Sequence, residues 1–244
     1  SDSMIILLAI YVALMLLMAI EATSALARLT GYALGRIDAS MVLMNAVNLV
    51  SRALMAFVLP AIGLFADLGR TVGPGMIVVA LQLAFPIALL FVFLYRRELT
   101  QVLSWRATSL TQTGSLFGRG VNLEQTADYN HSRIRRARRL VNKRFLGFLL
   151  IFGAAMTPHY TVWGLLIILV QEFPDYRATF LALTSVFNGM TVLILSLYFD
   201  PMIVRFARSK WLVIAMLETT VLMRIWSALL SVLVLASVVL ALNL

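Results

Sequence analysis

Long apolar runs separated by polar connections are the main pattern of this chain. A helix needs about 20 mostly apolar residues to cross the hydrocarbon core of a membrane. Runs of that length or more lie near residues 4–26, 41–66, 75–95, 145–170, 178–199 and 211–242. They are continuous, whereas the strands of an outer-membrane barrel alternate apolar and polar residues. The pattern predicts an all-α fold, a single transmembrane domain (1–244) with about six membrane-spanning helices.

Composition supports the same class of protein. Hydrophobic residues make up 61% of the chain and the mean hydropathy is +0.94, whereas soluble domains are roughly 45–50% apolar. Cysteine is absent, which excludes disulfides, thiolate nucleophiles and cysteine-based metal sites. We expect no metal and no cofactor. We also expect Met4 to be the native start, and the first run to be a retained helix because it lacks a basic segment and a cleavage site.

Positive charge is concentrated on one side of the predicted spans. Of the net charge of +9, most lies in the long third connection, residues 96–144, and the rest mainly in the first and fifth connections. The second and fourth connections offer only Arg70 and Arg177. By the positive-inside rule, the odd-numbered connections are cytoplasmic and both termini lie outside. This placement favours anionic membrane lipids as partners of the cluster 133–144, at about 1 kcal/mol per residue, over nucleic acid.

The long basic connection divides into parts with different patterns. Leu99, Leu103 and Leu110 recur at helical spacing, which predicts an interfacial amphipathic helix continuing from the third span. Residues 111–130 are polar and glycine-containing, which indicates a mobile loop.

Polar residues inside the spans are the candidates for function. Glu21 and Arg52 lie within apolar runs, where an ionised side chain costs roughly 2.5–3.5 kcal/mol. Offsets of three and seven residues fall near one face of a helix. Three polar stripes have this spacing: Glu21, Ser24 and Arg28; Asn45, Asn48 and Arg52; and Arg177, Thr184, Asn188 and Thr191. They predict a shared hydrophilic interior, with hydrogen bonds that merely join helices, worth about 0.6 kcal/mol each, as the alternative.

His159 follows Pro158 within the fourth span. A titratable ring beside a proline kink is a candidate switch. A hydrogen-bonded core histidine is the alternative, and from sequence it is the favoured one.

Several short motifs of this chain resemble those of the Amj family, the alternative lipid II flippases. The motifs lie at 20–23, 27–31, 44–45, 50–52 with Pro60, 176–179, 187–191 and 199–201. The similarity covers most of the chain, from about residue 4 to residue 201. Val58 and Leu59 depart from the more polar approach to Pro60 that the family leads us to expect.

The resemblance implies a multi-pass protein of the cytoplasmic (inner) membrane. It implies a non-enzymatic flippase that moves the undecaprenyl-pyrophosphate-linked peptidoglycan precursor, lipid II, from the inner to the outer leaflet by alternating access. Arginine binds phosphate oxygens in bidentate fashion, so the expected pyrophosphate ligands are Arg52, Arg28, Arg177 and Arg224. Asn45, Asn48, Asn188 and Thr191 are expected to line a polar cavity.

The energy source has two candidates. Glu21 is expected either to pair with Arg28 or Arg52, or to act with His159 as a protonatable coupling group. The alternative to proton coupling is the membrane potential, since each negative charge moved outward gains about 2.3 kcal/mol per 100 mV. A nucleotide-binding GxxxxGK[ST] loop is absent from the sequence.

Other functions stay open at this point. The same stripes suit an ion-coupled transporter of a small anionic solute, and a non-transporting envelope membrane protein is a further alternative. A lipid-modifying enzyme needs a nucleophile with a base or a metal cluster, and the motifs for these are missing. Six helices are few for so large a headgroup, which suggests a homodimer. Asn48 with Pro60 loosely mirrors Asn188 with Pro201, as in a 3+3 inverted repeat.

Overall fold

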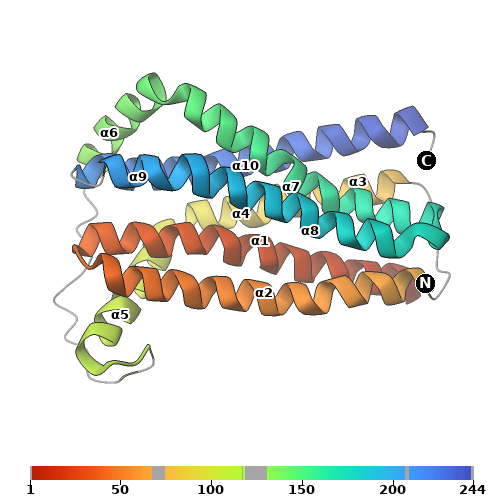
Figure 1. Cartoon of the computed structure of the whole chain (residues 1–244), viewed down its shortest axis with the longest axis horizontal. Helices are drawn as coiled ribbons and strands as arrows, with labels where there is room; N and C mark the ends of the chain where they lie inside the picture. Colours follow the sequence, from red (N-terminus) through yellow and green to blue (C-terminus); the bar gives the residue numbers. More distant parts are fainter. Residues whose placement is uncertain (1, 68–74, 117, 119–130, 207–208, 243–244) are drawn as a thin grey trace.

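The structure is a computed structural model that describes residues 2–67, 75–116, 118, 131–206 and 209–242. These residues form a bundle of long helices (Figure 1), six of which are long and apolar enough to cross a membrane. The prediction of an all-α, multi-pass membrane protein is therefore confirmed. The helices are α1 (Asp2–Leu34), α2 (Ile37–Asp67), α3 (Gly75–Gln82), α4 (Ala84–Leu94), α5 (Arg96–Thr113), α6 (His131–Arg144), α7 (Leu146–Glu172), α8 (Arg177–Ile194), α9 (Asp200–Phe206) and α10 (Lys210–Leu242), with short turns at Pro174–Tyr176 and Leu195–Phe199.

The first two spans are longer than the apolar runs that predict them. α1 continues to Leu34 and α2 begins at Ile37, because the polar ends of both helices extend beyond the apolar core. Gly35 joins them with a φ of +70°, the left-handed conformation that glycine adopts freely. A Cβ at Gly31 would lie 1.9 Å from the Ser40 hydroxyl oxygen, so the absence of a side chain lets α1 and α2 approach closely.

Two spans have irregular backbone beside a proline. The third span divides at Leu83 into α3 and α4; Pro86 has no N–H to offer to the carbonyl four residues earlier, which weakens the helix there. The fifth span contains a π turn at Leu195–Phe199, closed by a bond from the Asp200 N–H to the Leu195 carbonyl. Pro201 follows directly and cannot donate in turn.

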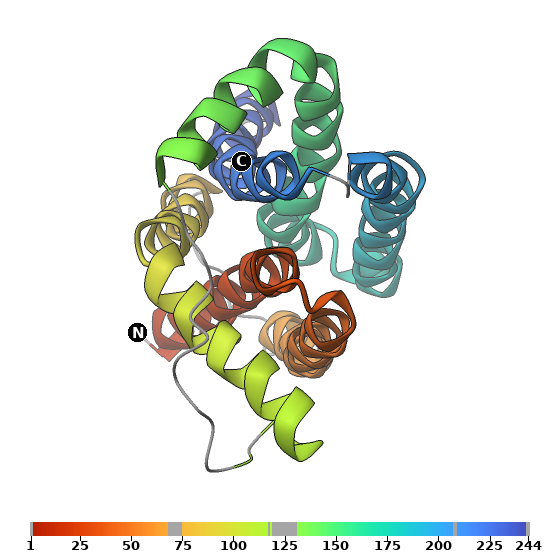
Figure 2. The ribbon, with the colours of Figure 1, turned by 90° about the vertical axis from the view of Figure 1, so that its left-hand side faces the viewer.

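The long connection contains two helices. The predicted amphipathic helix is present as α5, and the basic cluster forms α6, which the sequence pattern did not identify as helical. Of the predicted loop 111–130, residues 117 and 119–130 lie outside the described residues. Figure 2 faces this end of the bundle, where α5 packs against α1 and α2, and α6 packs against α10.

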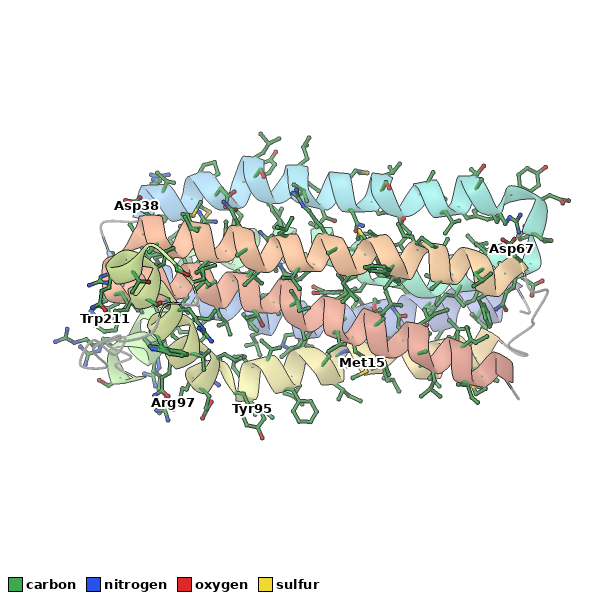
Figure 3. The ribbon with its side chains drawn as sticks, turned by 90° about the horizontal axis from the view of Figure 1, so that it is seen from below. Met15, Asp38, Asp67, Tyr95, Arg97 and Trp211 are labelled. Carbon is green, nitrogen blue, oxygen red and sulfur yellow. The ribbon has the colours of Figure 1, made fainter. Side chains whose placement is uncertain are left out.

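Both termini lie at the opposite end of the bundle from α5 and α6 (Figure 1). Figure 3 shows Asp38 and Asp67 at the two ends of α2, with Arg97 and Trp211 at the Asp38 end. We call the Asp38 end the basic end. Its assignment to the cytoplasm stays a prediction from charge. Within each half of the chain the first span packs against the other two, α1 on α2 and α4, and α7 on α8 and α10; the inverted repeat also stays a prediction.

Candidate functional site

A polar cavity of about 370 Å³ lies inside the bundle. Its walls come from α1, α2, α7, α8, the π turn and α10, so both halves of the chain contribute. The polar residues that line it are Glu21, Ser24, Asn48, Ser51, Arg52, His159, Asn188, Thr191 and Arg224. The other residues that line the cavity are apolar, and one of these residues, Val192, is 62% exposed. The cavity therefore reaches the molecular surface where α2 and α8 face each other.

The cavity lies near the middle of the spans. With a rise of 1.5 Å per residue, Glu21, His159 and Arg224 are each about 20 Å along their helices from the basic end. At this depth water is scarce, and a charged side chain needs a partner or a water-filled space. Offsets within single helices put these residues on inward faces, and packing of α1, α7 and α10 against their neighbours brings them together.

A hydrogen-bonded network joins four helices, α1, α2, α7 and α8, at the cavity wall. The Nε2 atom of His159 lies 3.0 Å from Oε2 of Glu21, and its Nδ1 atom lies 2.6 Å from Oδ1 of Asn188. The Ser51 hydroxyl, on α2, is 3.5 Å from the other oxygen of Glu21. His159 is only 5% exposed. The favoured expectation of a hydrogen-bonded core histidine agrees with this geometry, and its partners make it part of the site.

Two arginines supply positive charge to the cavity. Arg224 donates to the Tyr160 hydroxyl at 3.4 Å, and its guanidinium lies 5.8 Å from the centre of the Phe152 ring. Its Nε atom is buried and has no hydrogen-bond partner in the described structure. Arg52 has no carboxylate within 4.0 Å among the described residues. Two arginines against the single carboxylate of Glu21 give the lining of the cavity an excess of positive formal charge.

The structure brings most of the predicted site residues together. Thr191 donates to the Ala155 carbonyl at 3.1 Å, which joins α8 to α7 ahead of Pro158. Asn48 faces the same space from α2. Asn45, one turn earlier, is exposed and does not line the cavity.

Arg28 and Arg177 do not line the cavity. Arg28 bonds to Asp200 at 2.5 Å, nearer the basic end, and Arg177 pairs with Asp67 at the opposite end of the bundle. Of the two expectations for Glu21, pairing with Arg28 or Arg52 is not seen among the described ion pairs, and its partner is His159, the other candidate coupling group. The physical reason is that Arg28 lies two turns beyond Glu21, level with the start of α9.

A buried charge cluster at the basic end was missed by sequence reasoning. Glu218 of α10 is 1% exposed, accepts a hydrogen bond of 2.5 Å from Nε of Arg96 of α5, and forms an ion pair at 2.5 Å with Arg138 of α6. The signal that identified Glu21, an acidic residue inside an apolar run, applies equally to Glu218. Through this cluster, α5 and α6 of the long connection are both joined to α10 of the bundle.

Comparisons of the chain with known protein families, with curated proteins and with solved structures find no match. The assignment of a function therefore depends on the cavity and on the motif resemblance described above.

Proposed function

We propose that this protein is a flippase for a polyprenyl-pyrophosphate-linked peptidoglycan precursor, lipid II. The observation that carries the proposal is the pair Arg52 and Arg224 in a mid-membrane cavity with one carboxylate between them. An arginine side chain at this depth needs an anion or a water-filled space, and the exposed Arg52 has no carboxylate partner among the described residues. A phosphate-bearing substrate offers them the anion that the protein does not.

The shape of the cavity supports a lipid-linked anion. A volume of about 370 Å³ falls within the usual range of small-ligand pockets, about 300–1,000 Å³. It suits a pyrophosphate group and is too small for a disaccharide-pentapeptide. Because the cavity reaches the surface between α2 and α8, the sugar-peptide portion can extend out of it while the polyprenyl chain stays in the lipid. The guanidinium fork of Arg52 would bind two phosphate oxygens.

The membrane potential provides a driving force for this cargo. If the basic end is cytoplasmic, a dianionic headgroup moves outward with the field. Two charges then gain about 4.6 kcal/mol per 100 mV. In this proposal the protein belongs to the cytoplasmic membrane of a bacterium.

Anionic lipids are the proposed partners of α6. Its apolar residues Ile134, Ala137 and Val141 are buried against the bundle, whereas Arg135, Arg136 and Arg139 are exposed. An exposed row of arginines at the membrane interface attracts anionic headgroups at about 1 kcal/mol per residue. This contact would hold the cytoplasmic end of the bundle at the surface of the bilayer.

Cavity size favours a second candidate function, the transport of a small anionic solute. Such a solute would occupy the 370 Å³ completely and would need no opening toward the lipid. The two functions differ in whether lipid II reaches the outer leaflet.

The deciding experiment measures lipid II exposure on the outer face of cells depleted of their main lipid II flippase. These cells carry the wild-type protein, Arg52→Gln, or the control Arg177→Gln, whose arginine pairs with Asp67 outside the cavity. We expect exposure with the wild type and with Arg177→Gln, and at least about tenfold less with Arg52→Gln at equal expression, because a charge-assisted arginine–phosphate hydrogen bond is lost. No exposure with the wild type refutes the flippase and favours the small-solute transporter.

A further inference from the structure

We propose that Glu21 and His159 form a proton-binding site, and that the proton they hold raises the affinity of the cavity for a phosphate anion. The inference rests on the proposed anion-binding function of the cavity and adds its regulation. It follows from the hydrogen-bond pattern around His159 and from the charges that share the cavity with it.

The orientation of Asn188 decides which nitrogen of His159 carries a hydrogen. The amide nitrogen of Asn188 lies 3.8 Å from the sulfur of Met55, to which it donates. The amide oxygen therefore faces Nδ1 of His159, at 2.6 Å. An amide oxygen only accepts hydrogen bonds, so Nδ1 is the donor.

A second hydrogen must then lie between His159 and Glu21. With Nδ1 protonated, a neutral ring presents a lone pair at Nε2. An ionised Glu21 would place a second lone pair 3.0 Å away, and two acceptors at that distance repel each other. The contact is attractive only with one further proton, either on the ring as an imidazolium or on the carboxyl group. In both forms the pair is neutral overall.

Because charged groups face this pair, the proton it holds changes the affinity of the cavity for an anion. Arg52 of α2 and Arg224 of α10 line the same cavity, and Tyr160 lies next to His159 on α7. Among the described residues, α8 presents only uncharged side chains to the cavity, Asn188, Thr191 and Val192. With the proton bound, the cavity carries the two arginine charges in full. Without it, the free carboxylate of Glu21 cancels one of them and competes with a phosphate for the guanidinium groups.

Proton and anion binding are therefore linked, and the linkage is reciprocal. A proton that strengthens phosphate binding is itself bound more tightly when the phosphate is present, by the same factor. Such a site moves a proton and an anion in the same direction. For outward movement of a dianion with one proton, a net negative charge remains to be driven by the membrane potential.

The first test measures the dissociation constant of farnesyl diphosphate for the purified full chain at pH 5.5 and pH 8. Glu21→Gln is the matched variant, because its neutral amide imitates the protonated carboxyl and the ligand titrates identically in both experiments. We expect the wild-type affinity to fall about tenfold more than that of Glu21→Gln over this interval. Equal pH dependence of the two proteins overturns the proton linkage and leaves the proposed function intact. Absence of binding by both proteins at both pH values refutes the anion site itself.

The second test does not alter the pair. In His131→Gln, His159 is the remaining histidine of the chain, and its ring nitrogens are observed by ¹⁵N NMR. At pH 5.5 we expect Nδ1 to be protonated and Nε2 to be either protonated or hydrogen-bonded to a protonated carboxyl. A neutral ring protonated only at Nε2 would overturn the assignment.

Discussion

Replacing Glu218 with glutamine tests how the long connection is fastened to the bundle. The Glu218 carboxylate is buried and bonds at 2.5 Å to both Arg96 and Arg138, whose side chains are 20% and 28% exposed. The variant keeps the shape and removes the negative charge that both guanidinium groups contact. Breaking a buried ion pair from one side costs about 3–5 kcal/mol. We expect a loss of that size in the free energy of unfolding.

Thermal unfolding of the purified protein measures this loss. For chains of about this length, 1 kcal/mol shifts the midpoint by about 2–4 °C, so the expected decrease is about 6–20 °C. Glu98→Gln, on the exposed face of α5, removes the same charge and should change the free energy by at most about 0.5 kcal/mol. Equal midpoints for the two variants would refute the assignment of Glu218 as the anchor of α5 and α6.

Two further predictions concern packing and surface charge. A Cβ at Gly164 would lie 2.4 Å from a methyl group of Leu235, so Gly164→Ala should lower the free energy of unfolding by about 1–3 kcal/mol. At Gly189 nothing lies within 4 Å, so Gly189→Ala should leave the unfolding midpoint nearly unchanged. Similar losses for the two variants would contradict the packing argument. Arg177 pairs with Asp67 in a half-exposed position, so Arg177→Gln should cost at most about 1 kcal/mol, and a larger loss in the same assay would show that the pair is structurally important.

The spans were predictable because their signal is local. About 20 consecutive apolar residues are needed wherever a helix crosses the membrane, and this requirement appears in the sequence without reference to any neighbour. The ends of α1 and α2 were less predictable, since Leu34 and Ile37 belong to helical extensions whose stability comes from packing and from the glycine turn between them. The helical state of α6 was not predicted because only three apolar residues, Ile134, Ala137 and Val141, form its buried face. Among the many arginines of this segment, so few apolar positions give a weak helical pattern.

Most members of the candidate site were predictable, but Arg28, Arg177 and Asn45 lie outside the cavity and the pairing of the members was not predictable. Helical spacing placed Glu21, Asn48, Arg52 and Asn188 on inward faces, but spacing within one helix does not say which helix lies opposite. The His159–Glu21 contact joins residues that are 138 positions apart. Such a contact depends on the packing of α1 against its neighbours, which periodicity does not reveal.

The π turn at Leu195–Phe199 sets the rotation of everything that follows it in the fifth span. A π turn holds one residue more than an α turn, and each residue of an α-helix turns the chain by about 100°. Deleting one residue from this turn would restore regular α geometry and rotate α9 by about that angle. Asp200, which now bonds to Arg28, would then point away from α1. A single inserted position in the chain therefore aligns the two halves of the bundle at the basic end.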